Sequence, residues 1–314
     1  MPTAVLDDQR FTKYFDQVPS LGLIGDTPLL RLRALEAESP DFAVYAKQEW
    51  RNPGGSMKDR PVRRMLLDAI ETGALTTDKI ILDSSSGNAG IAYAMLGRAL
   101  GYRVRLYVPA NASQERKDRL AAHDAEVIYT DAVEGYDHAL RTCHKEAHDH
   151  PEQYFFCNQY ANDNNWQAHY YETAAEIIEQ TDGKLTHFVA GVGTGGSITG
   201  IGRRLKEFNP KIEVISILPE NFPGIEGLKP LENPEDIRPD ILDDSVIDRW
   251  VRVTAEDAYD HCHLLAKHGL FVGQSSGAYL AGVRQVAQEA RKGLCVTINC
   301  DIGERYFSSA LWQQ

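Results

Sequence analysis

Short apolar runs alternate with longer stretches of mixed polarity along most of the chain. Runs rich in β-branched and aromatic residues predict strands, and apolar positions repeated at helical spacing predict helices. We expect strands at residues 42–49, 79–83, 103–108, 126–130 and 154–158, and a second set at 185–190, 213–218, 246–253 and 294–299. Helices are expected at residues 91–100, 195–208, 254–268 and 276–291.

The alternation of strands and helices indicates an α/β fold with mostly parallel sheets that carry helices on both faces. Ligands of such folds bind at the carboxyl ends of the strands. The length of 314 residues accommodates two such units. We therefore predict two three-layer α/β domains, residues 1–158 and 159–314, that face a shared cleft. The proline- and acid-rich stretch 221–244 is predicted to be a long loop, either an ordinary surface excursion or a functional element.

Composition and charge narrow the classes of function. The chain has 43% hydrophobic residues and a formal net charge of -12. This charge argues against nucleic-acid or anionic-membrane partners, although a local basic pocket can still hold a small anion. No apolar run has transmembrane length and residues 1–10 do not resemble a signal peptide, so we expect a cytoplasmic protein. Without a C-x-x-C pair, the five cysteines are expected to be reduced thiols: Cys143, Cys157, Cys262, Cys295 and Cys300.

One lysine lies between a tight turn and a predicted helix. Residues 52–55 read Asn-Pro-Gly-Gly, which is turn chemistry, and Ser56 is a candidate N-cap that places Lys58 in the first helical turn. The helix dipole and the unpaired backbone amides disfavour an ammonium group there, so we expect a lowered pKa and an amine suited to a Schiff base. The alternative is a solvent-exposed lysine after a turn.

Two polar loops that each follow a predicted strand offer further candidate sites. Residues 84–90 read Ser-Ser-Ser-Gly-Asn-Ala-Gly and form a donor-rich segment, suited to a carboxylate or a phenolic oxygen, unless its side chains only cap the helix. Residues 271–278 contain a serine that either donates to a heterocycle nitrogen or caps the next helix.

The glycine-rich loop 191–200 predicts a phosphate site at a helix N-terminus, because glycines allow close approach of the backbone and two hydroxyl groups lie nearby. Gly191, Gly193 and Gly196 also match the dinucleotide fingerprint, and Glu220 is then a candidate ribose-binding acid. The loop alone therefore does not separate a nicotinamide cofactor from another phosphorylated cofactor, or from a purely structural turn.

The lysine, the asparagine loop, the glycine loop and the late serine, in this order, resemble the cysteine synthase family of pyridoxal-phosphate enzymes, also called O-acetylserine sulfhydrylases. The resemblance extends from the Ile-Gly-Asp-Thr-Pro-Leu segment at 24–29 to the Gly-Glu-Arg-Tyr segment at 303–306, which is nearly the whole chain. Segments 111–116 and 299–306 are more similar to B-type than to A-type members. The resemblance implies fold type II, which is tryptophan synthase β-like, an active site in the cleft between the domains, and a homodimer.

The resemblance also implies roles for single residues. Lys58 would bind pyridoxal 5'-phosphate as a Schiff base, Asn88 would donate to its phenolic oxygen, and Ser275 would contact its pyridine nitrogen. The cofactor phosphate would be held by Gly193, Thr194, Gly195, Gly196 and Ser197. The substrate carboxylate would be bound by Ser85, Ser86, Asn88, Ala89 and Gln159, although for Gln159 a polar strand end is an alternative.

The implied activity is the synthesis of L-cysteine. Sulfide, or thiosulfate, replaces the acetoxy group of O-acetylserine through an aminoacrylate intermediate, while Lys58 acts in turn as nucleophile, base and acid. Two departures from the family affect substrate choice. Ala89 stands where a threonine is usual, and residues 223–229 lack the paired arginines of some B-type members, which makes a bulky anionic sulfur donor less expected. Asp301 is interpreted as not contacting the pyridine nitrogen.

Other functions are compatible with parts of this pattern. A cystathionine β-synthase or an O-phosphoserine sulfhydrylase would share the cofactor residues, and a serine or threonine dehydratase fits the loop contexts less well. An NAD-dependent oxidoreductase would leave Lys58 and Asn88 unexplained, and a non-catalytic regulatory relative would not require the lysine. The histidines near residues 144–150 and 261–268 lack a full ligand set, so no metal is expected.

Overall fold

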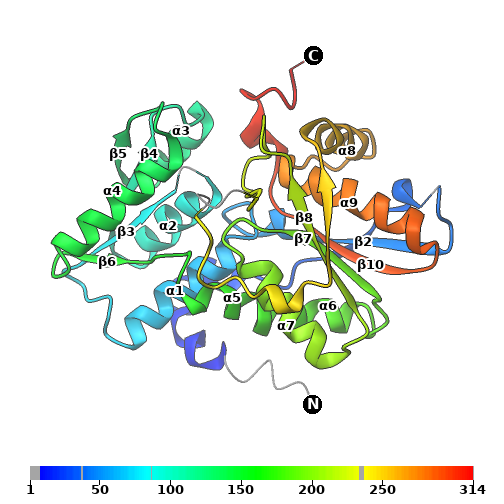
Figure 1. Cartoon of the computed structure of the whole chain (residues 1–314). Coiled ribbons are helices and arrows are strands. Elements are labelled where there is room, and N and C mark those ends of the chain that lie inside the picture. Colours follow the sequence, from blue (N-terminus) through cyan, green and yellow to red (C-terminus); the bar gives the residue numbers. More distant parts are fainter. Residues whose placement is uncertain (1–7, 37, 86, 233–236, 314) are drawn as a thin grey trace.

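The computed structural model describes residues 8–36, 38–85, 87–232 and 237–313. Figure 1 shows two α/β units, each built around one sheet. In spatial order, the larger sheet contains β1 (Leu29–Arg31), β2 (Phe42–Gln48), β10 (Gly293–Asn299), β7 (His187–Gly191), β8 (Glu213–Pro219) and β9 (Arg249–Val253). The smaller sheet contains β5 (Glu126–Thr130), β4 (Arg103–Pro109), β3 (Ile80–Ser84) and β6 (Tyr154–Phe156).

The strands of both sheets run parallel, apart from β1, which pairs with β2 in the antiparallel direction. The α-helices of the smaller unit and its flank are α1 (Asp59–Glu71), α2 (Asn88–Ala99), α3 (Gln114–Ala122), α4 (Gly135–Asp149) and α5 (Asp163–Ala168). Those of the larger unit are α6 (Ala174–Gln180), α7 (Gly196–Phe208), α8 (Ala255–Lys267) and α9 (Gln274–Ala290). This arrangement confirms the predicted α/β class with mostly parallel sheets.

Helices cover both faces of each sheet, which explains the apolar runs in the strands. In β3, Ile81 packs in the core that includes α1 and α2, whereas Ile80 and Leu82 pack in a second core with Cys143 of α4. Neighbouring residues of a strand point to opposite faces, so both faces of this strand are buried. In the larger unit, α8 and α9 lie on one side of the sheet and α6 and α7 on the other (Figure 1).

The predicted strands and helices are found, with differences at several ends. The strand predicted at 246–253 begins only at Arg249, because the Asp243 carboxylate accepts a hydrogen bond from the Ser245 amide at 3.0 Å and residues 244–246 form a 3-10 turn. Such a local side-chain bond competes with strand pairing. The strand predicted at 154–158 ends at Phe156, and Asn158 has a left-handed backbone with φ of 48°.

Sheet membership does not follow the predicted boundary at residue 158. The strand β2 from the first half of the chain pairs with β10 from the second half along its whole length, and the two strands lie side by side in Figure 1. The larger sheet therefore includes a segment from each half of the chain. The assignment of residues 1–158 and 159–314 as domains stays a prediction. Within the described ranges, no helix is long and apolar enough to cross a membrane.

Candidate active site

A cavity of about 710 Å³ is lined by residues of both units. Its walls are formed by loops that follow the carboxyl ends of β3, β7, β8 and β10, and by the N-terminal ends of α1, α2, α7 and α9. This is the edge at which α/β folds bind ligands. Of the candidate residues that lie in the described ranges, the cavity lining includes all but Gly196: Lys58, Ser85, Asn88, Ala89, Gln159, Gly193, Thr194, Gly195, Ser197 and Ser275. Ser86 lies outside the described residues.

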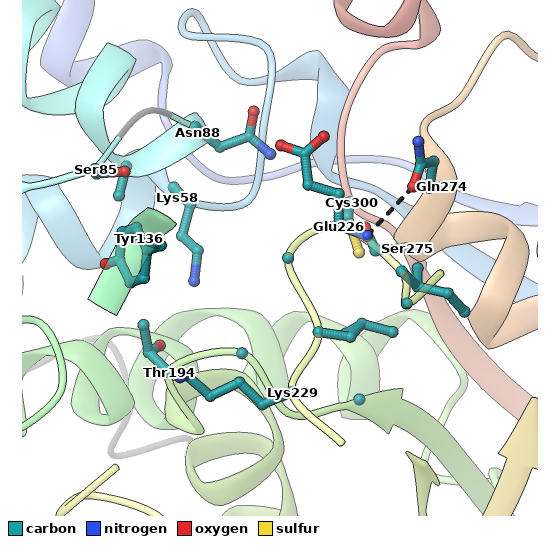
Figure 2. Close-up of a pocket in the computed structure, with 18 of the residues that line it drawn as sticks. Lys58, Ser85, Asn88, Tyr136, Thr194, Glu226, Lys229, Gln274, Ser275 and Cys300 are labelled. Atoms are coloured by element: carbon teal, nitrogen blue, oxygen red, sulfur yellow. Dashed lines mark hydrogen bonds between the residues drawn. The ribbon is translucent and has the colours of Figure 1, made fainter. Parts of the chain in front are cut away.

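Lys58 extends into this cavity from the start of α1 (Figure 2). Burial lowers the pKa of its ammonium group, and a weaker opposing effect comes from the Cys300 thiol. Its Nζ has no hydrogen-bond or ion-pair partner among the residues that the structure describes. The predicted direction of the pKa is confirmed, and desolvation by burial is its main cause.

The prediction that Ser56 caps α1 is wrong. The helix begins at Asp59, Lys58 itself is the N-cap residue, and no side chain caps this end. Ser56 Oγ instead accepts a hydrogen bond from the Lys58 amide at 3.3 Å. Ser56 also pairs with Asp301 in an isolated antiparallel bridge, which ties the turn to the segment after β10. The lysine is therefore held by the turn and by a distant part of the chain.

The glycine loop between β7 and α7 forms a cradle in which the backbone at Gly193, Gly195 and Gly196 carries no side chain. Gly195 is the N-cap of α7 with φ of 82°, a left-handed conformation that favours glycine. A Cβ on Gly193 would lie 2.4 Å from the Gly227 carbonyl oxygen, and one on Gly196 would lie 2.1 Å from Asn165 Oδ1. Backbone N–H groups at such a helix start can bind a phosphate, and the hydroxyl groups of Thr194 and Ser197 lie beside them.

The loop between β3 and α2 places Asn88 at the first position of α2. Ser85 Oγ accepts a hydrogen bond from the Gly90 amide at 3.0 Å, so this serine hydroxyl braces the loop. The Asn88 amide donates to Asp301 Oδ2 at 2.8 Å, and its oxygen accepts a hydrogen bond from Arg305. Residues after β10 therefore orient the amide of Asn88.

Ser275 is buried in the first turn of α9, which begins at Gln274 after an N-cap glycine that makes no side-chain cap. The alternative that a serine of this loop caps α9 is therefore not observed. Ser276 Oγ instead accepts from the Cys300 amide at 2.8 Å. The Ser275 hydroxyl lines the cavity on the side opposite the β3–α2 loop (Figure 2).

Asp301 is fully buried but does not line the cavity. Burial raises the pKa of its carboxyl group, although Arg305, Asn88 and Tyr306 act in the opposite direction. Tyr306 donates to Asp301 Oδ2 at 2.7 Å, the same oxygen that Asn88 contacts. This position agrees with the interpretation that Asp301 acts on neighbouring side chains and not on a ligand in the cavity.

The structure adds cavity residues that the sequence analysis did not identify. Arg116 of α3 and Glu226 of the 220–230 loop form an ion pair at the cavity wall, with Tyr306 beside them. The stretch 221–244 was predicted to be a long loop, which was the available signal for Glu226. For Arg116, its place in segment 111–116 gave no indication of a role. In the described part of the chain, no group of three His, Cys, Asp or Glu is placed to hold a metal ion.

A buried ion network next to Lys58 was also not foreseen. Arg60 has no exposed surface and binds both carboxylate oxygens of Glu49, each at 2.8 Å. Arg60 also pairs with Glu176, whose carboxylate contacts Lys47. Burial alone would raise the pKa of Glu49, but the charge and hydrogen bonds of Arg60 lower it to about 2. The network holds the start of α1 against the larger sheet.

Comparisons with known proteins give consistent results. The model of the family described as "Pyridoxal-phosphate dependent enzyme" matches residues 21–301. The cysteine synthase of Aquifex aeolicus is 47% identical over 300 residues, which cover 93% of this chain and 91% of that protein. Cysteine synthase B of Pseudomonas aeruginosa is 36% identical over 94% of this chain and 98% of its own length. The crystal structure of the cysteine synthase of Entamoeba histolytica superimposes with a TM-score of 0.87 at 33% identity, covering 93% and 90% of the two chains.

Proposed function

Because the chain belongs to the family of pyridoxal-phosphate dependent enzymes, and within it to the cysteine synthases, we propose that it replaces the acetoxy group of O-acetylserine by sulfide. The products are L-cysteine and acetate. The observation that carries this proposal is the placement of Lys58, an amine of lowered pKa that extends into a cavity beside a glycine cradle. The order of the motifs along the chain and the names of its relatives agree with it.

The residues of the cavity fit the cofactor. Lys58 would form the imine with its aldehyde, and Gly193, Thr194, Gly195, Gly196 and Ser197 would hold its phosphate at the start of α7. Asn88 would donate to the phenolic oxygen, and the neutral hydroxyl of Ser275 would contact the pyridine nitrogen. When bound, pyridoxal phosphate supplies an electron sink for the α-carbon of the substrate.

The side chains of the chain would then bind the substrate and move protons. Ser85, Asn88, Ala89 and Gln159 line one end of the cavity, where the substrate carboxylate would be bound. Lys58 would remove the α-proton and later return it, because its lowered pKa keeps the amine neutral more readily than in an exposed lysine. The loss of a hydroxyl at Ala89 leaves backbone and neighbouring hydroxyl groups to bind the carboxylate.

The nicotinamide alternative receives no support from Glu220, its candidate ribose ligand. Glu220 Oε1 accepts a hydrogen bond from the Ala255 amide at 2.7 Å, so this carboxylate has a structural role at the start of α8. We extend the proposal to a homodimer in the cytoplasm. The five cysteines are all buried and unpaired, as expected in a reducing compartment.

The test combines a spectrum with a chemical trap. The purified protein with pyridoxal phosphate is expected to be yellow, to change its absorption when O-acetylserine is added, and to form cysteine with sulfide. Borohydride reduction followed by peptide mass spectrometry should locate the cofactor on Lys58, and Lys58→Ala should lose both the label and the activity. A label on another lysine, or turnover that survives Lys58→Ala, would refute the proposal. The exposed Lys184 provides the matched control, as Lys184→Ala should change neither result.

A further inference from the structure

Lys229 lies on a loop that runs beside the glycine cradle. Its backbone amide donates to the Val192 carbonyl at 2.7 Å. A Cβ on Gly193 would lie 2.4 Å from the Gly227 carbonyl oxygen, so the two loops are in direct contact. Lys229 also lines the cavity, and in Figure 2 its side chain extends along the glycine loop towards Thr194. The lysine therefore reaches the place where the cofactor phosphate would be bound.

The ammonium group of Lys229 is held near the cradle but is not paired. Its Nζ lies 5.3 Å from the ring centroid of Tyr160. Tyr160 follows Gln159, whose carbonyl oxygen accepts a hydrogen bond from the Asn165 side chain at 2.6 Å. The same amide group of Asn165 donates to Thr194 Oγ1 at 3.0 Å, which connects this region to the cradle. Within the described part of the chain, the ammonium group of Lys229 has no hydrogen-bond or ion-pair partner.

The other cationic side chains among the described residues of the cavity wall are those of Lys58 and Arg116. Arg116 is paired with the carboxylate of Glu226. Lys58 would be joined to the cofactor aldehyde. The glycine loop 191–200 itself contains no charged residue. Lys229 is therefore the cation that is left for an anion bound at the cradle.

The charge of the cofactor phosphate exceeds what the helix can compensate. A phosphate monoester carries a charge of about -1.5 to -2 at pH 7. The N-terminus of α7 is equivalent to about +0.5, and the hydroxyl groups of Thr194 and Ser197 are neutral. About one negative charge or more is thus left uncompensated. A lysine ammonium group supplies this charge as a point charge, and its hydrogen bond to a phosphate oxygen is charge-assisted.

We propose that Lys229 is a further ligand of the cofactor phosphate and stabilises its dianionic form. The inference rests on the cofactor site of the proposed function and concerns cofactor binding, not the reaction. The backbone N–H groups of the cradle set the position of the phosphate, and Lys229 adds the missing charge. Lys229 thereby favours the phosphorylated cofactor over the same ring without a phosphate.

The test compares two aldehydes that differ in the phosphate. Pyridoxal phosphate and 5'-deoxypyridoxal can both form an imine with Lys58, but only the first carries a phosphate. The dissociation constants of both are measured with the full-length protein after removal of the cofactor, for wild type, Lys229→Gln and Lys229→Arg. We expect Lys229→Gln to bind pyridoxal phosphate about tenfold more weakly or worse, and deoxypyridoxal as tightly as wild type does. Lys229→Arg keeps the charge and should keep most of the affinity.

Lys117→Gln is the matched control. The Nζ of Lys117 also lies 5.3 Å from a tyrosine ring centroid, that of Tyr129, but Lys117 does not line the cavity. This variant should bind both aldehydes as wild type does. An unchanged affinity of Lys229→Gln for pyridoxal phosphate, or an equal loss of affinity for both aldehydes, would overturn the inference.

Phosphorus NMR of the holoenzyme gives a second measurement. We expect the bound phosphate of Lys229→Gln to take up a proton at a higher pH than that of wild type, because the dianion has lost its cation. A phosphate resonance that responds to pH in the same way in both proteins would overturn the inference. Neither measurement requires cysteine formation. If the protein bound the cofactor but made no cysteine, only the proposed reaction would fail.

Discussion

Substitution of Glu49 by glutamine should destabilise the protein by removing one charge from the buried network beside Lys58. Glu49 has no exposed surface, and its two oxygens accept hydrogen bonds from Arg60, Thr27 and Asn52. The carboxylate thus fixes both the start of α1 and the turn that precedes Lys58. Glutamine has the same shape and keeps the volume, but it loses the charge. Its NH2 group, a donor, would then face the guanidinium of Arg60, which also donates.

The size of the expected destabilisation follows from the shift in the pKa of Glu49 on folding. In the folded protein the pKa of Glu49 falls from 4.5 to about 2. Each unit of pKa shift corresponds to about 1.4 kcal/mol, so folding favours the ionised form of Glu49 by about 3 kcal/mol. Breaking a buried ion pair by removing one partner costs about 3 to 5 kcal/mol, which agrees. Because the folded pKa is the lower one, this contribution is complete above pH 4.5 and is lost as the pH falls toward 2.

The assay is denaturant unfolding of wild type and Glu49→Gln with saturating cofactor, at several pH values from 7 down to 3. We expect a difference in unfolding free energy of about 3 kcal/mol at pH 7 that narrows below pH 4.5. The control is Glu126→Gln, because Glu126 pairs with Arg105 at a largely exposed position and should cost at most about 1 kcal/mol. A loss below about 1 kcal/mol for Glu49→Gln, or a difference that does not depend on pH, would refute the reasoning.

Three further predictions concern the cavity. The rate at which the cofactor-free protein attaches pyridoxal phosphate should reach its plateau below pH 10.5, because burial lowers the pKa of Lys58 and the neutral amine is the reactive form; a rate still rising at pH 10.5 would contradict this. Gly193→Ala should weaken cofactor binding by about tenfold or more in equilibrium dialysis, since the new Cβ would meet the Gly227 carbonyl at 2.4 Å. Asp301 orients Asn88, so Asp301→Asn should shift the visible band of the bound cofactor no further than Asn88→Ala does; a further shift when Asp301→Asn is added to Asn88→Ala would show that this carboxylate acts on the ring by another route.

The parts of the fold that were predicted from the sequence are those with a strong local pattern. The run of apolar residues in β10 predicts a strand covered on both faces, and the structure buries Val296 and Thr297 completely, two neighbours that point to opposite faces. The strand β1 was not predicted, because it has only three residues and one of them, Leu30, is 40% exposed. Local sequence carries little information about such a short edge strand, whose pairing with β2 depends on the rest of the sheet.

The candidate site shows the same division between local and distant information. A loop that leads from a strand to a helix is recognisable from a few neighbouring residues, so the segments that contain Lys58, Gly195 and Ser275 were candidates from the sequence. The roles of the three residues were predicted only from the order of the motifs, which resembles the cysteine synthase family. The pair of Arg116 and Glu226 could not be identified in this way, because the two residues are far apart in the chain and only the closure of the cavity brings them together. Nothing in the charge pattern around either residue indicates the other.

Asn88 illustrates how a residue can be identified from sequence while its orientation cannot. The amide nitrogen has two hydrogens, and only one is needed for the bond to Asp301 Oδ2. Arg305 donates to the amide oxygen, which forces the nitrogen to point in one direction. The second N–H group is then the one available to a phenolic oxygen in the cavity. The contacts with Asp301 and Arg305 are therefore compatible with the proposed role of Asn88, and they explain how residues outside the cavity determine the direction in which it donates.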